Sequence, residues 1–569
     1  MSSAPPPLPT ATVHRRLPLA APLRPGRPSE IWFKPALSVV AAVAPPNLLL
    51  LALGRLDLAV YSMAGSLCAL YAHNRPYAAR ARALAWVVLG MLGGLAVALV
   101  AASLTRDAVV LVTVGAVLAA AQKALCDAAR IGPPSHVILI FVSSASLFVP
   151  QTLGQVPGHL ALAAAAGVWA WLVGMAPALV RPHGPERRAT AHALRAAAAH
   201  TGAADGARDR SRTRADAYAA VQDAWQTLLA AGNRPSATRR ALGRLLVRAE
   251  TALASPAAAD PARLRGWANE LRGTGPVPDD VPGDGTGELL GVAAGRSVAS
   301  PSLWRRLGPL TPIAVRTALG CALAGYASLA LGVGRPYWAL VTAAALYQAN
   351  IALTWNRTVQ RVAGNLVGVL LFAAVAPVAG LGPLALVLCC LVLNFGAEAV
   401  ISRNYWLGSV CVTPLALLVA EFPGYRPAGE LITDRVVDTL VGALVGFAAA
   451  LAVTNRRAGD RVEAAITAVG EARDDLARLL ADRPAVAAPA AACHRLAAAL
   501  VELRAAADAA SGEWWPRTPP RERVVLAEQS GHRTLAAGVR HQGALTAPGT
   551  ATDTDTATGT GTDTEDGRP

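Results

Sequence analysis

The chain has 569 residues, of which 53% are hydrophobic and only 16% charged, and its mean hydropathy of +0.39 excludes an ordinary soluble enzyme of this size. The net charge of +15 comes almost entirely from Arg beside the ends of apolar segments, which favours membrane topogenesis over nucleic-acid binding. Lys34 and Lys123 are the only lysines and neither follows a Gly-rich loop, which excludes the phosphate-binding motif of the common nucleotide hydrolases.

Residues 1–34 are rich in Pro and Arg and are predicted to form a disordered cytosolic N-terminus. Twelve apolar segments follow in two groups of six, each long enough or nearly long enough to cross a hydrocarbon core roughly 30 Å thick. They are residues 35–53, 58–72, 83–104, 108–125, 136–150 and 158–180, then 312–331, 337–353, 362–378, 381–395, 405–420 and 436–453. The sequence therefore predicts an all-α membrane protein of about twelve transmembrane helices, in membrane regions 35–180 and 304–455.

Basic residues are concentrated at alternate ends of these segments, which places them on one side of a membrane. Arg80, Arg130 and Arg361 lie at such ends, whereas Arg106, at an opposite end, has Asp107 beside it. Because basic loops are retained on the inside, we expect a multi-pass protein of the cell (inner or plasma) membrane with both termini in the cytoplasm.

The two groups of six segments resemble copies of one another. At a single common shift, three residues of the first group recur in the second: Tyr61, Tyr71 and Asn74 recur as Tyr337, Tyr347 and Asn350. A nearly equal shift relates Arg130 and Pro150 to Arg403 and Pro423. Because six is an even number, the copies would share one orientation, which predicts two parallel six-helix repeats.

Three polar regions complete the chain. Residues 181–303 contain amphipathic helical patterns and a linker rich in Gly, Pro and Asp over 273–295, and are predicted to be a cytosolic helical insert. Residues 456–545 predict a second cytosolic helical bundle. Residues 546–569 are almost devoid of apolar side chains and are predicted to be a disordered tail.

The second membrane region carries the motifs with the most information. They read RPYWALVTAAALYQANIALTWNRTVQRVAGNLVGVLLF over 335–372, RNYWLGSVCVTPLALL over 403–418 and DRVVDTLVGALVG over 434–446. This Tyr-Trp start, Arg-rich turn and Gly-spaced helix resemble the fusaric acid resistance protein (FUSC) family, also called aromatic acid exporters. The resemblance covers the second membrane region and is weaker over the first, and it implies a membrane transporter that exports aromatic or other organic acids.

Arg357 and Arg361 are spaced so that both lie on one helix face, and Gly364 and Gly368 continue that face. The arginine pair could hold a substrate carboxylate, or it could be a positive-inside anchor beside glycines that allow close helix packing. The same small-residue spacing predicts helix packing at Gly442 and Gly446 in the last segment.

Four further groups are candidates for a substrate path. Tyr337 and Trp338 could stack on an aromatic substrate or belong to an interfacial belt. Glu398 could carry a coupling proton, or it could pair with Arg403 and fix the turn between them. Arg316, inside a span, should pair, snorkel or line a water-filled path. The interior amides are expected to bond between helices; they are Asn350, Asn394 and Asn404.

The sequence lacks the signatures of catalysis and of metal binding. HExxH is absent, the ten His are scattered, and Cys389 and Cys390 point about 100° apart on a helix, so we expect no enzymatic activity, no metal and no cofactor. The expected partners are membrane lipids, a small organic anion and a second copy of the chain in a homo-oligomer, but not nucleic acid. Proton-coupled efflux is the leading hypothesis; a passive organic-anion channel and a membrane scaffold with partner-binding cytosolic bundles are the alternatives.

Overall fold

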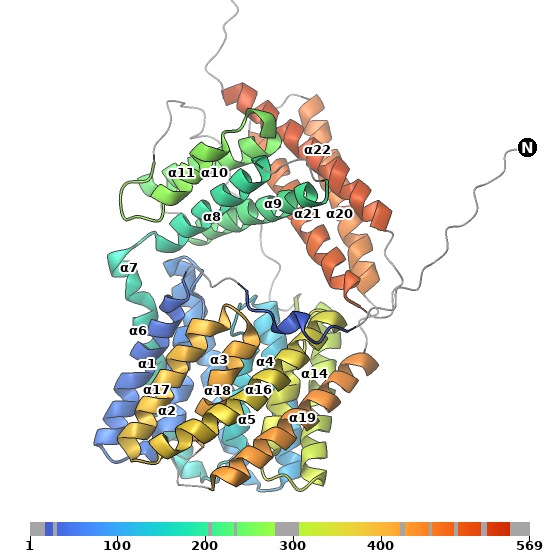
Figure 1. Cartoon of the computed structure of the whole chain (residues 1–569). Helices are drawn as coiled ribbons and strands as arrows, with labels where there is room; N and C mark the ends of the chain where they lie inside the picture. Colours follow the sequence, from blue (N-terminus) through green and yellow to red (C-terminus); the bar gives the residue numbers. More distant parts are fainter. Residues whose placement is uncertain are drawn as a thin grey trace, which may run out of the picture.

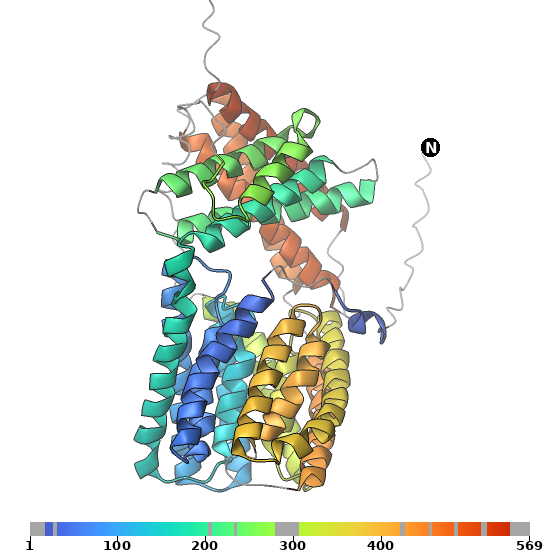
Figure 2. The same ribbon diagram turned by 60° about the vertical axis from the view of Figure 1, so that its left-hand side comes forward.

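The fold consists of a bundle of apolar helices with a layer of polar helices on one of its ends (Figures 1 and 2). The computed structural model describes residues 17–26, 31–202, 207–232, 236–278, 306–420, 427–453, 458–482, 487–513 and 521–546. Within these ranges the chain is mainly helical and contains no strand. The predicted disordered tail from 547 onward, the linker from 279 and the repeat partner Pro423 lie outside the described residues.

Each of the twelve predicted apolar segments contains a helix of the bundle. In the first half these are α1 (Phe33–Ala52), α2 (Ala59–Ser66, continued by η3, Leu67–Leu70), α3 (Tyr77–Leu104), α4 (Ala108–Ala128), α5 (His136–Leu147) and α6 (Val156–Met175). In the second half they are α14 (Thr311–Ala330), α15 (Pro336–Leu346), α16 (Ile351–Ala379), α17 (Pro383–Ile401), α18 (Tyr405–Val419) and α19 (Ala428–Ala452).

Eight of these helices are long and apolar enough to cross a membrane by themselves. The other four are shorter: α2 with η3, α5, α15 and α18. At 1.5 Å per residue, the 11 residues of α15 reach only about 16 Å, roughly half of a hydrocarbon core. The structure therefore supports eight full spans, not the predicted twelve, and the short helices occupy the second and fifth places of both halves.

The predicted segment 337–353 is wrong beyond Leu346, because the chain leaves the helical conformation at Tyr347. Asn350 then caps the next helix, and its Oδ1 accepts a hydrogen bond of 2.8 Å from the backbone N–H of Leu353. As a result, α16 begins at Ile351, eleven residues earlier than predicted. In the first half, the short second helix likewise ends at a tyrosine, Tyr71, the repeat partner of Tyr347.

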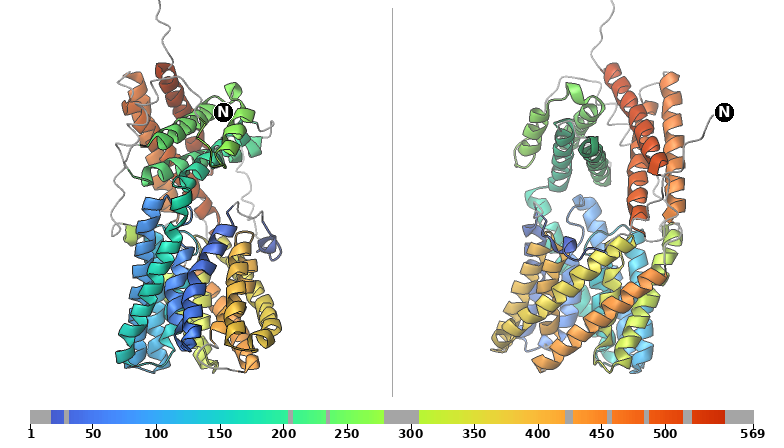
Figure 3. Two further views of the ribbon diagram at one scale, coloured as in Figure 1. Left: turned by 90° about the vertical axis from the view of Figure 1, so that its left-hand side faces the viewer. Right: turned by 45° about the vertical axis from the view of Figure 1, so that its right-hand side comes forward.

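The helices of both halves are paired in the same way. The third helix packs on the fifth (α3 on α5, α16 on α18), and the second packs on the sixth (α2 on α6, α15 on α19). The first helix of each half packs on the fourth helix of the other half, α1 on α17 and α14 on α4. No residue of the four short helices is exposed, so these helices lie towards the inside of the bundle. Figure 3 shows the bundle and the polar layer from two further sides.

The polar layer contains the helices α8 (Gly184–Thr201), α9 (Ala207–Ala230), α10 (Ala237–Ala254), α11 (Pro261–Glu270), α20 (Ala458–Ala481), α21 (Ala487–Ser511) and α22 (Arg521–Thr546), and the short α7 (Pro177–Val180) joins it to α6. Buried residues of the insert, such as Leu194 and Leu246, share one apolar core with Leu476 and Leu496 of the C-terminal region. The prediction of two separate bundles is therefore wrong: amphipathic patterns indicate which face of a helix is buried, but not which helix covers it.

Residues 17–26 also differ from the prediction, which placed them in a disordered N-terminus. They lie across the ends of α16 and α18 that face the polar layer, as a segment that we call the strap. The side chains of Trp355 and Trp406 donate hydrogen bonds to the carbonyl oxygens of Pro18 (3.0 Å) and Leu23 (2.9 Å). Asn404 donates to the carbonyl oxygens of Pro22 and Arg24 at 2.8 and 2.9 Å.

Candidate functional site

A cavity of about 3110 Å³ begins between the polar layer and the bundle and continues into the bundle. All four short helices line it. Both ends of α15 contribute, with Tyr337 and Tyr347, and so do both ends of α18, with Tyr405 and Val419. Because these residues lie at opposite ends of their helices, the cavity follows the long axis of the bundle instead of crossing it.

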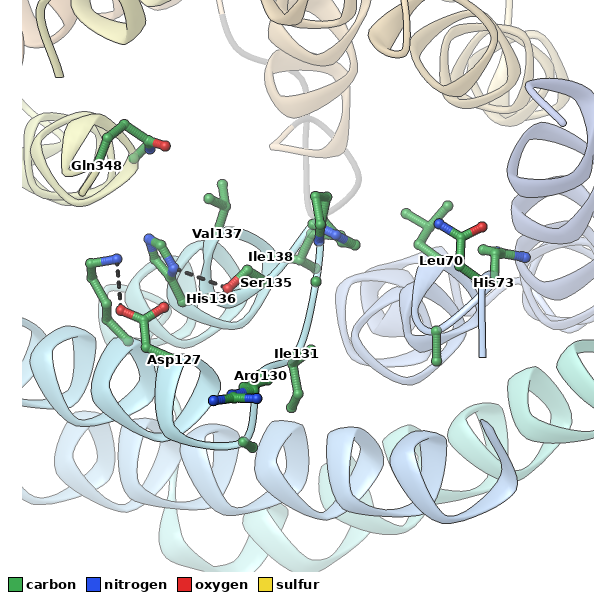
Figure 4. A pocket seen from close by; sticks show the side chains of 18 of the residues that line it. Leu70, His73, Asp127, Arg130, Ile131, Ser135, His136, Val137, Ile138 and Gln348 are labelled. Atoms are coloured by element: carbon green, nitrogen blue, oxygen red, sulfur yellow. Dashed lines mark hydrogen bonds and ion pairs between the residues drawn. The ribbon is translucent and has the colours of Figure 1, made fainter. Parts of the chain in front are cut away.

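Figure 4 shows part of this cavity. His136 and Gln348 lie on one side of the opening, and Leu70 and His73 lie on the other. His136 is buried, and its Nε2 is 3.3 Å from the carbonyl oxygen of Ala344 in α15. The first half therefore contacts the second half directly at the wall of the cavity.

Arginines dominate the second-half wall. Arg357 and Arg361 of α16 and Arg435 of α19 all line the cavity, and Arg361 and Arg435 are only 4% and 2% exposed. Tyr405 holds two of them: Arg361 Nη1 donates to its hydroxyl at 3.0 Å, and the Arg357 guanidinium lies 3.8 Å from its ring centroid. We call Arg357, Arg361 and Arg435 the arginine wall.

Glycines bring each helix of the arginine wall close to one of the short helices. A Cβ on Gly364 would lie 2.5 Å from Ser409 Cβ, and one on Gly368 would lie 2.6 Å from Thr413 Cβ, so α16 and α18 are in close contact. Gly442 and Gly446 do the same for α19 on α15, where a Cβ would meet Ala339 O at 2.5 Å and Ala343 Cα at 3.0 Å. Such contacts fix the positions of arginines one or two turns away.

A polar network joins α16, α18 and α19 in the second half. Thr413 of α18 donates to Asn365 Oδ1 at 2.7 Å, and Asn365 Nδ2 donates to Thr439 Oγ1 of α19 at 2.9 Å. All three side chains are buried. Asn365 was not selected from the sequence. The available signal was a polar amide directly after Gly364, in the helix that carries Arg357 and Arg361.

Trp338 is fully buried and does not face lipid, as an interfacial belt would require. The guanidinium groups of Arg335 and Arg435 lie 4.9 and 5.2 Å from its ring centroid. Tyr337 lines the cavity and stacks on Phe148 of the first half, with ring centroids 5.8 Å apart. Trp338 thus supports the arginine wall from behind, while Tyr337 contributes to the cavity surface.

Arg316 lines the cavity and also caps a helix. Its Nε and Nη2 donate to the carbonyl oxygen of Val453, at the C-terminus of α19, at 2.9 and 2.6 Å. Just beyond α21, Gly512 packs on Asn350, and its carbonyl oxygen accepts a hydrogen bond of 3.1 Å from the N–H of Ala352. The polar layer is therefore attached to the start of α16, one of the helices of the arginine wall.

Glu398 lines the cavity, but within the described residues no ion pair joins it to Arg403. Arg403 is exposed, does not line the cavity, and its carbonyl oxygen accepts a hydrogen bond of 2.8 Å from the N–H of Gly26 in the strap. Arg403 therefore lies apart from Arg357 and Arg361, and Arg435 joins these two arginines on the cavity. Asn394 faces the cavity, and its Nδ2 has no hydrogen-bond partner in the described structure.

The first-half wall has a different charge pattern. Lys123 and Asp127 of α4 line the cavity and form an ion pair of 3.2 Å, so their charges offset one another. No group of three or more His, Cys, Asp or Glu side chains in the described ranges is arranged to hold a metal ion. Arg75 and Arg130 also line the first-half wall, but more arginines line the wall of the second half.

Comparisons with known proteins point to the same half. Residues 321–449, from within α14 to within α19, match the family model described as fusaric acid resistance protein-like. The chain is 30% identical over 194 residues to the uncharacterized membrane protein YvaC of Bacillus subtilis (strain 168). The match covers 33% of this chain and 29% of YvaC, so it spans less than a third of that relative's length. No solved structure matches the chain. The resemblance noted in the sequence is thereby confirmed, and the chain is a multi-pass membrane protein.

Proposed function

Because residues 321–449 form a fusaric acid resistance-like membrane domain, we propose that this protein exports small organic acids across the membrane through the cavity between its two halves. The observation that carries this proposal is the arginine wall, Arg357, Arg361 and Arg435, on a cavity that both ends of α15 and α18 line. Cations this deeply buried in a membrane protein are costly, and they are retained where they bind substrates or ions.

The substrate class follows from the side chains around the arginine wall. Guanidinium groups bind carboxylates through paired, charge-assisted hydrogen bonds, and Arg357 and Arg361 are one helical turn apart. Tyr337 and Phe148 offer aromatic surface nearer the far end of the cavity. An aromatic carboxylate such as fusaric acid would use both features, the carboxylate on the arginines and the ring on the aromatic pair.

The paired arrangement of the two halves supports export by alternating access. The matching helix pairs, and the short helices in equivalent places, are what two parallel repeats would produce, with the substrate path at their interface. Rocking of one half against the other would open the cavity to either side in turn. The polar layer, the strap and both termini would lie in the cytoplasm, so the substrate would enter between layer and bundle.

Glu398 is our candidate for proton coupling. Of the carboxylates that line the bundle part of the cavity, Asp127 is paired with Lys123, whereas Glu398 forms no ion pair with a described residue. A carboxylate that can lose its proton on one side of a membrane and regain it on the other can couple substrate movement to the proton gradient. In a passive channel, Glu398 would have no such role.

The test is uptake of radiolabelled fusaric acid into inside-out proteoliposomes, with and without an imposed proton gradient. At a fusaric acid concentration below the wild-type KM, we expect gradient-driven accumulation that Arg361→Gln strongly reduces. Substitution of Arg403, an exposed arginine at the same end of the bundle, by Gln should leave it intact. Glu398→Gln should retain exchange of fusaric acid but lose accumulation. Accumulation by Arg361→Gln at the wild-type rate would contradict the proposal, and flux that is independent of the proton gradient would indicate a channel.

A further inference from the structure

A buried carboxylate lies next to the arginine wall but outside the cavity. Asp438 of α19 is fully buried and does not line the cavity, whereas Arg435, one helical turn before it, does. The spacing of three residues places both side chains on the same face of α19, with their Cβ atoms about 5–6 Å apart. Asp438 is therefore within reach of a guanidinium group that faces the cavity.

One hydrogen bond holds Asp438 against α14. The hydroxyl of Ser328, which is also fully buried, donates to Asp438 Oδ1 at 2.5 Å. The other carboxylate oxygen, Oδ2, is buried and has no hydrogen-bond partner in the described structure. Because a carboxylate accepts hydrogen bonds through both oxygens, and because a buried charge without partners is costly, Asp438 lacks a second partner.

Arg435 is also incompletely bonded. Its Nε is buried without a partner, and its guanidinium group lies 5.2 Å from the ring centroid of Trp338. Within the described residues no ion pair joins it to Asp438. On a helix, a basic residue before an acidic one is the weaker order for pairing. Rotation of the two side chains can bring them together, and the resulting pair would separate again readily.

We propose that Asp438 competes with the substrate carboxylate for Arg435. The guanidinium group binds the substrate while Ser328 holds Asp438, and it moves to Asp438 when the substrate leaves. A buried arginine without an anion is costly, so an internal carboxylate stabilises the empty site and speeds release of the substrate. This inference rests on the proposed function, because it requires an anion on the arginine wall. Asp438 is thus a positioning residue, which acts on the substrate through Arg435.

The first arm of the test is the binding of fusaric acid to the purified protein, measured by calorimetry. Asp438→Asn keeps the size of the side chain but removes the competitor, so the Kd should fall several-fold. Ser328→Ala releases the carboxylate towards Arg435, so the Kd should rise. A loss of packing would weaken binding in both variants, whereas partner exchange moves the two values in opposite directions.

Asp434→Asn is the matched control for this arm. Asp434 is the acid directly before Arg435, is only partly buried, and its Oδ2 lies 3.4 Å from the position of a Cβ on Gly334. Its neutralisation should leave the Kd unchanged. A Kd for Asp438→Asn at or above that of the wild type, or an equal fall for Asp434→Asn, would overturn the inference.

The second arm needs no substrate and separates this inference from the proposed function. Phenylglyoxal modifies arginine, and an arginine paired with a carboxylate reacts more slowly. Mass spectrometry should show faster modification of Arg435 in Asp438→Asn and slower modification in Ser328→Ala, with Arg357 unchanged as the internal control. Equal rates for Arg435 in all three proteins would overturn the inference. The expected rates without any binding of fusaric acid would support the exchange of partners and refute the proposed substrate class.

Discussion

The two halves of the bundle share one arrangement of helices but not one chemistry. In both, a short second and a short fifth helix face inward, and the helix pairs are the same. The second half presents Arg316, Arg335 and the arginine wall to the cavity, whereas the first half presents Arg75, Arg130 and an ion pair, Lys123 with Asp127. The second half is also the part that matches the fusaric acid resistance-like model. The comparison shows that the two halves share their helix pairs, and it supports our proposal that anion recognition belongs mainly to the second half.

The largest expected effect is the loss of the arginine wall. Arg361→Gln removes a buried charge that would bind the substrate, and charge-assisted hydrogen bonds are worth about 1.5–3 kcal/mol, so the apparent affinity for fusaric acid should fall by about 10- to 150-fold. The concentration dependence of uptake measures it.

The matched change in the first half is Lys123→Gln with Asp127→Asn, which removes both members of the ion pair at once. We expect a change of less than about threefold in uptake, because the net charge of the cavity stays the same. An equal loss in both variants would mean that anion recognition is shared between the halves.

The next effect concerns helix packing. A Cβ at position 368 would lie only 2.6 Å from Thr413 Cβ, so Gly368→Val overpacks this contact, and overpacking of this kind costs typically about 1–3 kcal/mol. The melting temperature of the bundle should fall. Gly93→Ala in α3, where nothing lies within 4 Å, should leave it unchanged or raise it slightly. A greater loss for Gly93→Ala than for Gly368→Val would show that the contact between α16 and α18 is not tight.

The smallest effect concerns the strap, which binds the ends of α16 and α18 and not the equivalent helices of the first half. Trp355→Phe with Trp406→Phe removes two hydrogen bonds, worth about 0.5–1.5 kcal/mol each. Hydrogen exchange of residues 17–26 should become about 5- to 150-fold faster. Trp169→Phe removes an indole bond to Ala41 in the first half and should leave exchange in the strap unchanged. Equal exchange in all three proteins would show that the strap is held by other contacts.

Hydropathy predicted the positions of all twelve apolar helices, because long apolar runs are a property of the local sequence. It did not predict that α15 ends at Leu346, because the ending depends on a single cap, Asn350, inside an otherwise apolar run. The strap was missed for a different reason: its partners, such as Trp355 and Asn404, lie more than 330 positions away in the chain. Such contacts leave no local pattern.

The site was predicted in part. Arg357, Arg361 and Glu398 were selected because ionisable groups near a span are costly, and the structure places all three on the cavity. Arg403 was selected on the same ground, but it is exposed. It lies in the turn between α17 and α18, and the spacing of residues along a helix does not predict which side chains of a turn face a cavity. Arg435 was not selected, because it lies one residue before the predicted last segment, 436–453; its helix begins at Ala428 and buries it.

An anion path along the short helices is the central claim, and cysteine accessibility tests it most directly. Val412 of α18 lines the cavity, whereas Val392 of α17 is 70% exposed on the surface of the bundle. In membranes containing a variant without the native cysteines, Val412→Cys should react with a negatively charged thiosulfonate reagent, and fusaric acid should slow the reaction. Val392→Cys should remain unmodified in lipid. An unreactive Val412→Cys, or a reaction rate indifferent to fusaric acid, would contradict the claim.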